Sequence, residues 1–153
     1  MSYVLVIDDQ PAIRTVVQTA LEEDGAFRVS GASTGDDALA RFDSDAPDLI
    51  VLDLVMPGMH GLELAAHACA RGIPVVLMTG EPTMTATLES LACPHLQKPF
   101  RMEQLLAEAR AAIEDAVANR RSVLEALHRL LAGGDAGDVL LQRVRAILEQ
   151  AEE

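Results

Sequence analysis

Five polar residues of this sequence stand at the ends of short apolar or β-branched runs. They are Asp8, Asp9, Asp53, Thr79 and Lys98. Lys98 is the only lysine in the chain, so a general need for basic surface residues does not explain it. If the runs are parallel strands, their carboxyl ends lie at one edge of a sheet, where the binding sites of such sheets form. We therefore expect these side chains to converge.

Three carboxylates in one place repel one another unless a cation neutralises them. A hard divalent ion, Mg²⁺ or Mn²⁺, prefers oxygen ligands, and Mg²⁺ commonly binds one or two carboxylates together with phosphate oxygens. Beside such an ion, Asp53 can attack phosphorus and form an aspartyl phosphate. A hydroxyl hydrogen bond from Thr79 and the charge of Lys98 can stabilise the phosphoryl oxygens. The pattern predicts a phosphoryl-transfer site.

Each of these residues also has a simpler interpretation when it is taken alone. Asp8 and Asp9 could cap a helix, and Asp53 could be an ordinary residue at the end of a strand. The stretch Met56-Pro57-Gly58 could be only a turn, because Pro and Gly are favoured there. Their joint placement at four strand ends favours the functional interpretation.

Length and charge argue against several classes of function. The chain has 153 residues, half of them hydrophobic, which suits one folded domain with a short appendage. A formal net charge of −12 argues against nucleic-acid binding, which depends on clustered Lys and Arg. No apolar run approaches the ~20 residues of a membrane span, and no leader pattern is visible. Cys69 and Cys93 lack metal-ligand spacing, so we expect reduced thiols and a cytoplasmic location.

Strand and helix patterns alternate along the first hundred or so residues. The expected strands cover Tyr3–Ile7, Phe27–Ser30, Leu49–Leu52, Val75–Met78 and His95–Gln97. The expected helices between them cover Ala12–Glu23, Gly35–Phe42, Leu62–Ala70 and Thr85–Leu91. Parallel strands need crossover connections, which bury both faces of the sheet. The sequence therefore predicts an α/β fold with a doubly wound, five-stranded parallel sheet.

A further helical pattern starts at Arg101 and continues to Leu131. Gly133 and Gly134 end it, and a last helix is expected over Val139–Glu149. This divides the chain into a first domain over residues 1–116 and a helical extension over residues 117–153. The extension is expected to form either a helical hairpin or a dimerisation segment that makes a homodimer. It is short and acidic, so we expect no DNA-binding output domain in it.

Four motifs together resemble bacterial two-component response-regulator receivers of the chemotaxis-regulator type. They are Asp8-Asp9, the stretch Asp53-Leu-Val-Met-Pro-Gly-Met-His-Gly61, Thr79-Gly80 and Lys98-Pro99-Phe100, and the resemblance covers about residues 3–116. It implies a flavodoxin-like sheet with strand order 2-1-3-4-5 and a cis peptide between Lys98 and Pro99. It also implies a phosphorelay in which a histidine kinase or phosphotransfer protein donates the phosphoryl group and an output protein, which the sequence does not name, receives the signal.

The resemblance assigns the metal ligands and the phosphoacceptor. Asp53 is the residue that accepts the phosphoryl group. Asp9, Asp53 and the backbone carbonyl of Val55 bind Mg²⁺ directly, and Asp8 contributes through a water molecule.

The resemblance also assigns a switch. Thr79 is the hydroxyl that moves toward the phosphoryl group, and Lys98 contacts that group directly. His95 stands where receivers usually carry Phe or Tyr, and its flat ring can take an inward or an outward rotamer. Glu81, two residues past Thr79, resembles a position that tunes self-dephosphorylation.

Two rival functions remain open. A phosphatase of the haloacid dehalogenase type also uses an Asp nucleophile after a strand, but it needs a second Asp two residues on, where this chain has Val55. A receiver-shaped binding module could instead signal through its helical tail without phosphorylation. We expect no enzyme activity beyond the chain's own phosphorylation and slow dephosphorylation.

Overall fold

The computed structural model of the protein describes residues 1–54, 61–132 and 139–151. Its sheet is parallel throughout and has the order β2-β1-β3-β4-β5. The strands are β1 (Ser2–Ile7), β2 (Phe27–Ala32), β3 (Leu49–Asp53), β4 (Val75–Thr79) and β5 (His95–Gln97). The three strands β1, β3 and β4 are almost wholly buried, as their uninterrupted apolar sequences require. Both the predicted fold class and the predicted strand order are confirmed.

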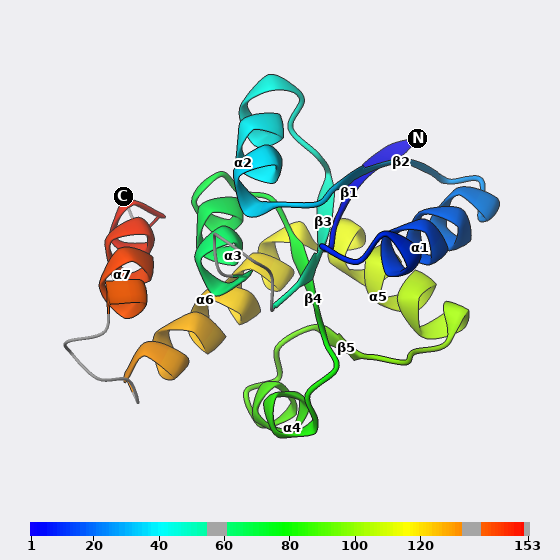
Figure 1. The fold of residues 1–153 in the computed structure, drawn as a ribbon. Helices are drawn as coiled ribbons and strands as arrows, with labels where there is room; N and C mark the ends of the chain where they lie inside the picture. Colours follow the sequence, from blue (N-terminus) through cyan, green and yellow to red (C-terminus); the bar gives the residue numbers. More distant parts are fainter. Residues whose placement is uncertain (55–60, 133–138, 152–153) are drawn as a thin grey trace.

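Five helices connect or follow the strands and cover both faces of the sheet. They are α1 (Pro11–Glu23), α2 (Gly35–Ser44), α3 (Gly61–Ala70), α4 (Pro82–Ser90) and α5 (Met102–Glu114). The helices α1 and α5 enclose one core with the sheet, while α2, α3 and α4 enclose a second core on the opposite face (Figure 1). The sequence predicted α4 from Thr85, but the helix begins one turn earlier because Pro82 occupies its first position.

The long helix predicted from Arg101 to Leu131 is wrong, because the chain leaves the helical conformation at Asp115. This residue has φ −132° and ψ 73°, and it separates α5 from α6 (Ala116–Ala132). Its Oδ1 accepts a hydrogen bond from the backbone N–H of Ala118 at 3.0 Å. A short acidic side chain that caps the next helix competes with continuation of the previous one. The chain therefore turns at the end of α5.

The turn sends α6 across the end of the sheet toward α3 (Figure 1). The side-chain amide of Asn119 accepts from the backbone N–H of Val75 at 2.8 Å and donates to its carbonyl at 3.0 Å. It takes the place of a strand partner at the start of β4, because the pairing of β5 with β4 begins only at Leu77. This buried contact anchors the start of α6.

The last helix, α7 (Val139–Ala151), lies beside α3 (Figure 1). Val144, Ile147 and Leu148 of α7 join the same hydrophobic core as Leu127 and Leu131 of α6. The tail thus packs back onto the sheet's own helices within one chain. The two Gly residues predicted to end the preceding helix lie outside the described residues. The domain boundary after residue 116 and the homodimer stay predictions.

Among the described helices, none combines the length and the apolar character needed to cross a membrane.

Candidate functional site

Strand register brings the predicted residues to one edge of the sheet. Ile7 of β1 is level with Leu52 of β3, so Asp8 and Asp53 follow at adjacent positions. Thr79 ends β4 and is level with Gln97 of β5, and Lys98 is the next residue. The backbone N–H of Lys98 donates to the carbonyl of Thr79 at 2.7 Å, which continues the ladder by one residue. The convergence therefore follows from parallel pairing.

Three carboxylates meet at this edge. One oxygen each of Asp8, Asp9 and Asp53 lies within 4.8 Å of the others. Asp8 is fully buried and Asp53 nearly so, whereas Asp9 is half-buried. Such a group of buried acids needs positive charge nearby, because like charges at this separation repel strongly when water is excluded.

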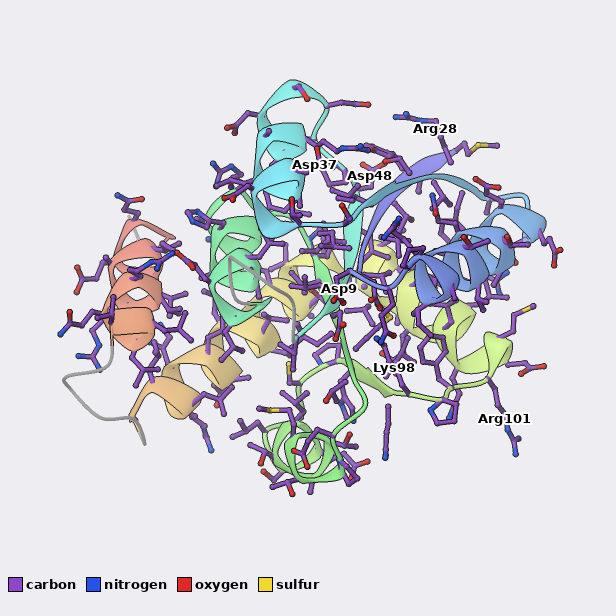
Figure 2. The ribbon with its side chains drawn as sticks, viewed as in Figure 1. Asp9, Arg28, Asp37, Asp48, Lys98 and Arg101 are labelled. Carbon is purple, nitrogen blue, oxygen red and sulfur yellow. The ribbon has the colours of Figure 1, made fainter. Side chains whose placement is uncertain are left out.

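Lys98 supplies one positive charge. Its Nζ lies 2.7 Å from Asp8 Oδ2 and 3.3 Å from Asp53 Oδ2. The ammonium is itself mostly buried, so both contacts are charge-assisted and shielded from solvent. Figure 2 labels Lys98 and Asp9 in the central part of the molecule, beside the ends of their strands. One lysine against three acids leaves a net negative site.

The donor set fits a hard divalent cation. All the clustered ligand atoms are carboxylate oxygens, and the excess negative charge is of the kind that Mg²⁺ or Mn²⁺ neutralises. The site opens into a cavity of about 470 Å³ lined by Asp9, Asp53, Thr79 and Lys98, among others. This space leaves room for waters and a phosphate beside the acids. The backbone carbonyl of Val55, the fourth predicted ligand, lies outside the described residues.

Glu81 also borders the cavity, but its carboxylate is engaged elsewhere. Its two oxygens accept hydrogen bonds from the backbone N–H groups of Thr83 at 3.0 Å and Met84 at 2.8 Å, and they cap α4. These backbone hydrogen bonds lower the pKa of Glu81. The backbone N–H of Glu81 donates to Thr79 Oγ1 at 3.1 Å. Thr79 is thereby linked directly to the start of α4, and the tuning role of Glu81 stays a prediction.

His95 lies away from the acids, in a groove between α4, β5 and α5. Its Nδ1 is 2.8 Å from the carbonyl oxygen of Cys93, and its Nε2 is 3.9 Å from Glu89 Oε1 on α4. The side chain is mostly buried, so the ring occupies an inward position. Whether it rotates stays a prediction.

Two contacts to Asp8 were not foreseen from the sequence. Arg14 Nη1 donates to the backbone carbonyl of Asp8 at 2.8 Å, and the backbone N–H of Gln10 donates to Asp8 Oδ1 at 2.9 Å. Both come from the start of α1 and fix the turn that carries the acidic pair. A lone Arg on a helix offers no pattern that would reveal such a role.

A parallel sheet of order 2-1-3-4-5 with acids and a lysine at its carboxyl edge defines the class of signalling receivers. The sequence model of the family described as "Response regulator receiver domain" matches residues 4–110. The chain belongs to the response regulator receiver family, whose domains act in phosphorelay signalling. The cis peptide between Lys98 and Pro99, which the resemblance implied, is present.

Relatives and solved structures agree with this membership. The chain is 35% identical over 127 residues to response regulator MprA of Mycobacterium ulcerans, covering 80% of this chain and 52% of that protein. It is 33% identical over 129 residues to transcriptional regulatory protein TrcR of Mycobacterium tuberculosis, covering 81% and 50% respectively. The chain thus spans about half the length of the curated relatives it matches.

Two solved structures show the same fold. The receiver domain of NtrX from Brucella abortus has a TM-score of 0.65 and 29% identity, covering 72% of this chain and 98% of that one. The chemotaxis protein CheY4 of Vibrio cholerae has a TM-score of 0.62 and 30% identity, with the same two coverages. In both cases the solved chain is matched almost from end to end, while about a quarter of this chain is left over.

Proposed function

We propose that this receiver accepts a phosphoryl group on Asp53 and uses the modification to switch a partner. The observation that carries the proposal is the cluster of three carboxylates with Lys98 between Asp8 and Asp53. A buried carboxylate beside a lysine, open to a polar cavity, suits nucleophilic attack on phosphorus. Asp8 and Asp9, with Asp53 and the carbonyl of Val55, would hold Mg²⁺ or Mn²⁺. When bound, the ion neutralises charge on the transferring oxygens.

The reaction takes one phosphoryl group from a phosphohistidine of a histidine kinase or phosphotransfer protein. An oxygen of Asp53 forms a bond to phosphorus, the bond between phosphorus and the imidazole nitrogen breaks, and the electron pair returns to the imidazole. Lys98 pairs with a phosphoryl oxygen as the charge moves onto Asp53. The hydroxyl of Thr79 donates a hydrogen bond to another phosphoryl oxygen. A cytoplasmic site of action stays part of the prediction.

The same contacts suggest how the signal leaves the site. The hydroxyl oxygen of Thr79 accepts a hydrogen bond from the backbone N–H of Glu81. Rotation of the Thr79 hydroxyl toward a phosphoryl oxygen would break this hydrogen bond at the start of α4. This helix borders the groove that contains His95. A change in α4 therefore reaches His95 and the groove, where an output protein would dock.

The nature of the output stays open to test. TrcR is named a transcriptional regulatory protein, whereas our prediction of no DNA-binding output domain in residues 117–153 rests on the shortness of that segment and on its five Arg against six acids. We propose that the receiver acts on a protein partner. The second rival, signalling without phosphorylation, is weakened by the complete set of acids, hydroxyl and lysine.

The test is phosphorylation of the full chain with acetyl phosphate and Mg²⁺, followed by intact-mass measurement. Wild type and Asp36→Asn, a control at an exposed acid in α2, should each gain one phosphoryl group. Asp53→Asn should gain none, because an amide cannot form the acyl phosphate. A phosphoryl gain that persists in Asp53→Asn would refute the assignment. Multiple-turnover release of phosphate from small added substrates would favour the phosphatase instead.

A further inference from the structure

Side chains of the tail hold both ends of α3. At its start, Arg143 of α7 binds Glu63 with two hydrogen bonds, Nε to Oε1 at 3.0 Å and Nη2 to Oε2 at 2.9 Å. At its end, Arg120 Nε of α6 donates to the carbonyl of Cys69 at 2.7 Å. Between these contacts, Val144 of α7 packs into the core that α3 shares. The tail is therefore a close-fitting support for α3.

The contact between Glu63 and Arg143 is charged and unevenly exposed. The side chain of Glu63 is only 6% exposed, whereas that of Arg143 is 56% exposed. Two parallel hydrogen bonds between a guanidinium and a carboxylate form the strongest geometry available to such a pair. Loss of Arg143 would leave a buried carboxylate without its partner, which is costly, whereas Arg143 alone can be solvated. The position of α7 on α3 therefore depends on this pair.

The start of α3 rests directly on the end of β3. The backbone N–H of Gly61 donates to the carbonyl of Leu54 at 3.2 Å. A Cβ built on Gly61 would lie 2.6 Å from both Cα and the carbonyl oxygen of Leu54, so the two backbones already touch. Leu54 is itself buried and follows Asp53. A displacement of α3 cannot be absorbed at this contact and would move the strand end that carries Asp53.

We propose that α7 clamps α3, and that Arg143 is a positioning residue for the carboxylate cluster. The clamp keeps Asp53 opposite Asp8 and Asp9, so that a divalent cation binds a ready arrangement of oxygens rather than one that it must first assemble. This inference rests on the proposed function of Asp53. Under this proposal, binding of a divalent cation to the carboxylate cluster and packing of α7 against α3 are coupled, and each favours the other.

The test measures Mg²⁺ binding to the full chain by isothermal titration calorimetry. Arg143→Gln should raise the Mg²⁺ dissociation constant about fivefold, the lower end of usual coupling between two sites. Arg145→Gln is the matched control, because it removes the same charge from an exposed position of the same helix and should leave the constant unchanged. Merely structural support would lower the unfolding midpoint without changing Mg²⁺ affinity in the folded protein.

Reciprocity supplies a second readout. Mg²⁺ should slow amide hydrogen exchange in residues 139–151 of wild type but not of Arg143→Gln. Should Arg143→Gln fail to fold, the double variant Glu63→Gln/Arg143→Gln leaves no unpaired buried charge and should shift the constant in the same direction. The inference would be overturned if folded Arg143→Gln, or the folded double variant in its place, had the same Mg²⁺ dissociation constant as Arg145→Gln. Failure of the proposed function is distinct from this, since it appears as no phosphorylation of wild type or as phosphorylation that does not depend on Asp53.

Discussion

Replacing Lys98 by Met tests whether the lysine compensates the buried acids. At an effective dielectric constant of about 20, its attraction to Asp8 at 2.7 Å amounts to about 6 kcal/mol and that to Asp53 at 3.3 Å to about 5 kcal/mol. Desolvation of the charges offsets much of this gain. Removing one partner from a buried ion pair costs about 3–5 kcal/mol, because the remaining charge stays uncompensated. We expect that loss in Lys98→Met when no divalent ion is present.

Urea unfolding with and without Mg²⁺ is the assay. With an m-value of about 2 kcal/mol/M, the unfolding midpoint of Lys98→Met should fall by about 2 M in EDTA. Saturating Mg²⁺ puts two positive charges beside the same acids, and ligand at about 100 times its dissociation constant stabilises the folded state by about 2.7 kcal/mol. The midpoint of Lys98→Met in Mg²⁺ should therefore return most of the way to the midpoint of wild type in EDTA.

A control variant separates this effect from a change in net charge. Arg121→Met removes one positive charge from an exposed position on α6 and should leave the midpoint nearly unchanged. If Lys98→Met were as stable as wild type in EDTA, or if Mg²⁺ failed to stabilise it, the acids would not form the cation-binding cluster described above.

Two further predictions concern the core. Asn119→Ala leaves the buried backbone N–H and carbonyl of Val75 at the start of β4 without their side-chain partner. This should lower the free energy of unfolding in urea by about 2–4 kcal/mol. An unchanged urea midpoint would show that the Asn119 amide is dispensable. Burial raises the pKa of both Cys69 and Cys93 to about 12 from an ordinary value of 9.0. The unfolded thiols lose their protons first as pH rises, so stability should fall between pH 9 and 12 by about 1.4 kcal/mol per pH unit for each thiol. Replacing both by Ala should flatten that slope, and native thiols should resist iodoacetamide at pH 8.

The sheet and the site were predictable because both follow from local patterns. Short apolar runs between amphipathic segments identify buried parallel strands, and a polar residue at the end of each run must then lie at the carboxyl edge. This reasoning places Asp8, Asp53, Thr79 and Lys98 without any long-range information. The prediction of the fifth strand, His95–Gln97, is confirmed, whereas the other four predicted strands were short by one or two residues at one end. Hydrogen bonding to a neighbouring strand extends a strand past its apolar run.

The path of the tail was not predictable in the same way. Apolar spacing continues across Asp115, so periodicity alone runs one helix through a residue whose side chain in fact caps the next. Nor does a sequence pattern join Glu63 to Arg143, because the two are 80 positions apart and meet only after α6 has crossed the sheet. Val117 continues the apolar spacing of Leu127 and Leu131, yet it is 68% exposed while the other two are buried.

The break at Asp115 decides which face of the receiver the tail covers. In the structure α6 leads to α3, and within the described residues no side chain after Glu108 lines the groove of about 430 Å³ between α4, β5 and α5, where His95 lies. A phosphoryl group on Asp53 would therefore act on two separate surfaces. On the two proposals above, it would reach the groove through Thr79 and α4, and it would reach α7 through the start of α3. Since the two surfaces do not overlap, an output protein in the groove need not displace the tail. If binding of that protein and packing of α7 influence each other, each must change the other's equilibrium constant rather than compete for the same surface.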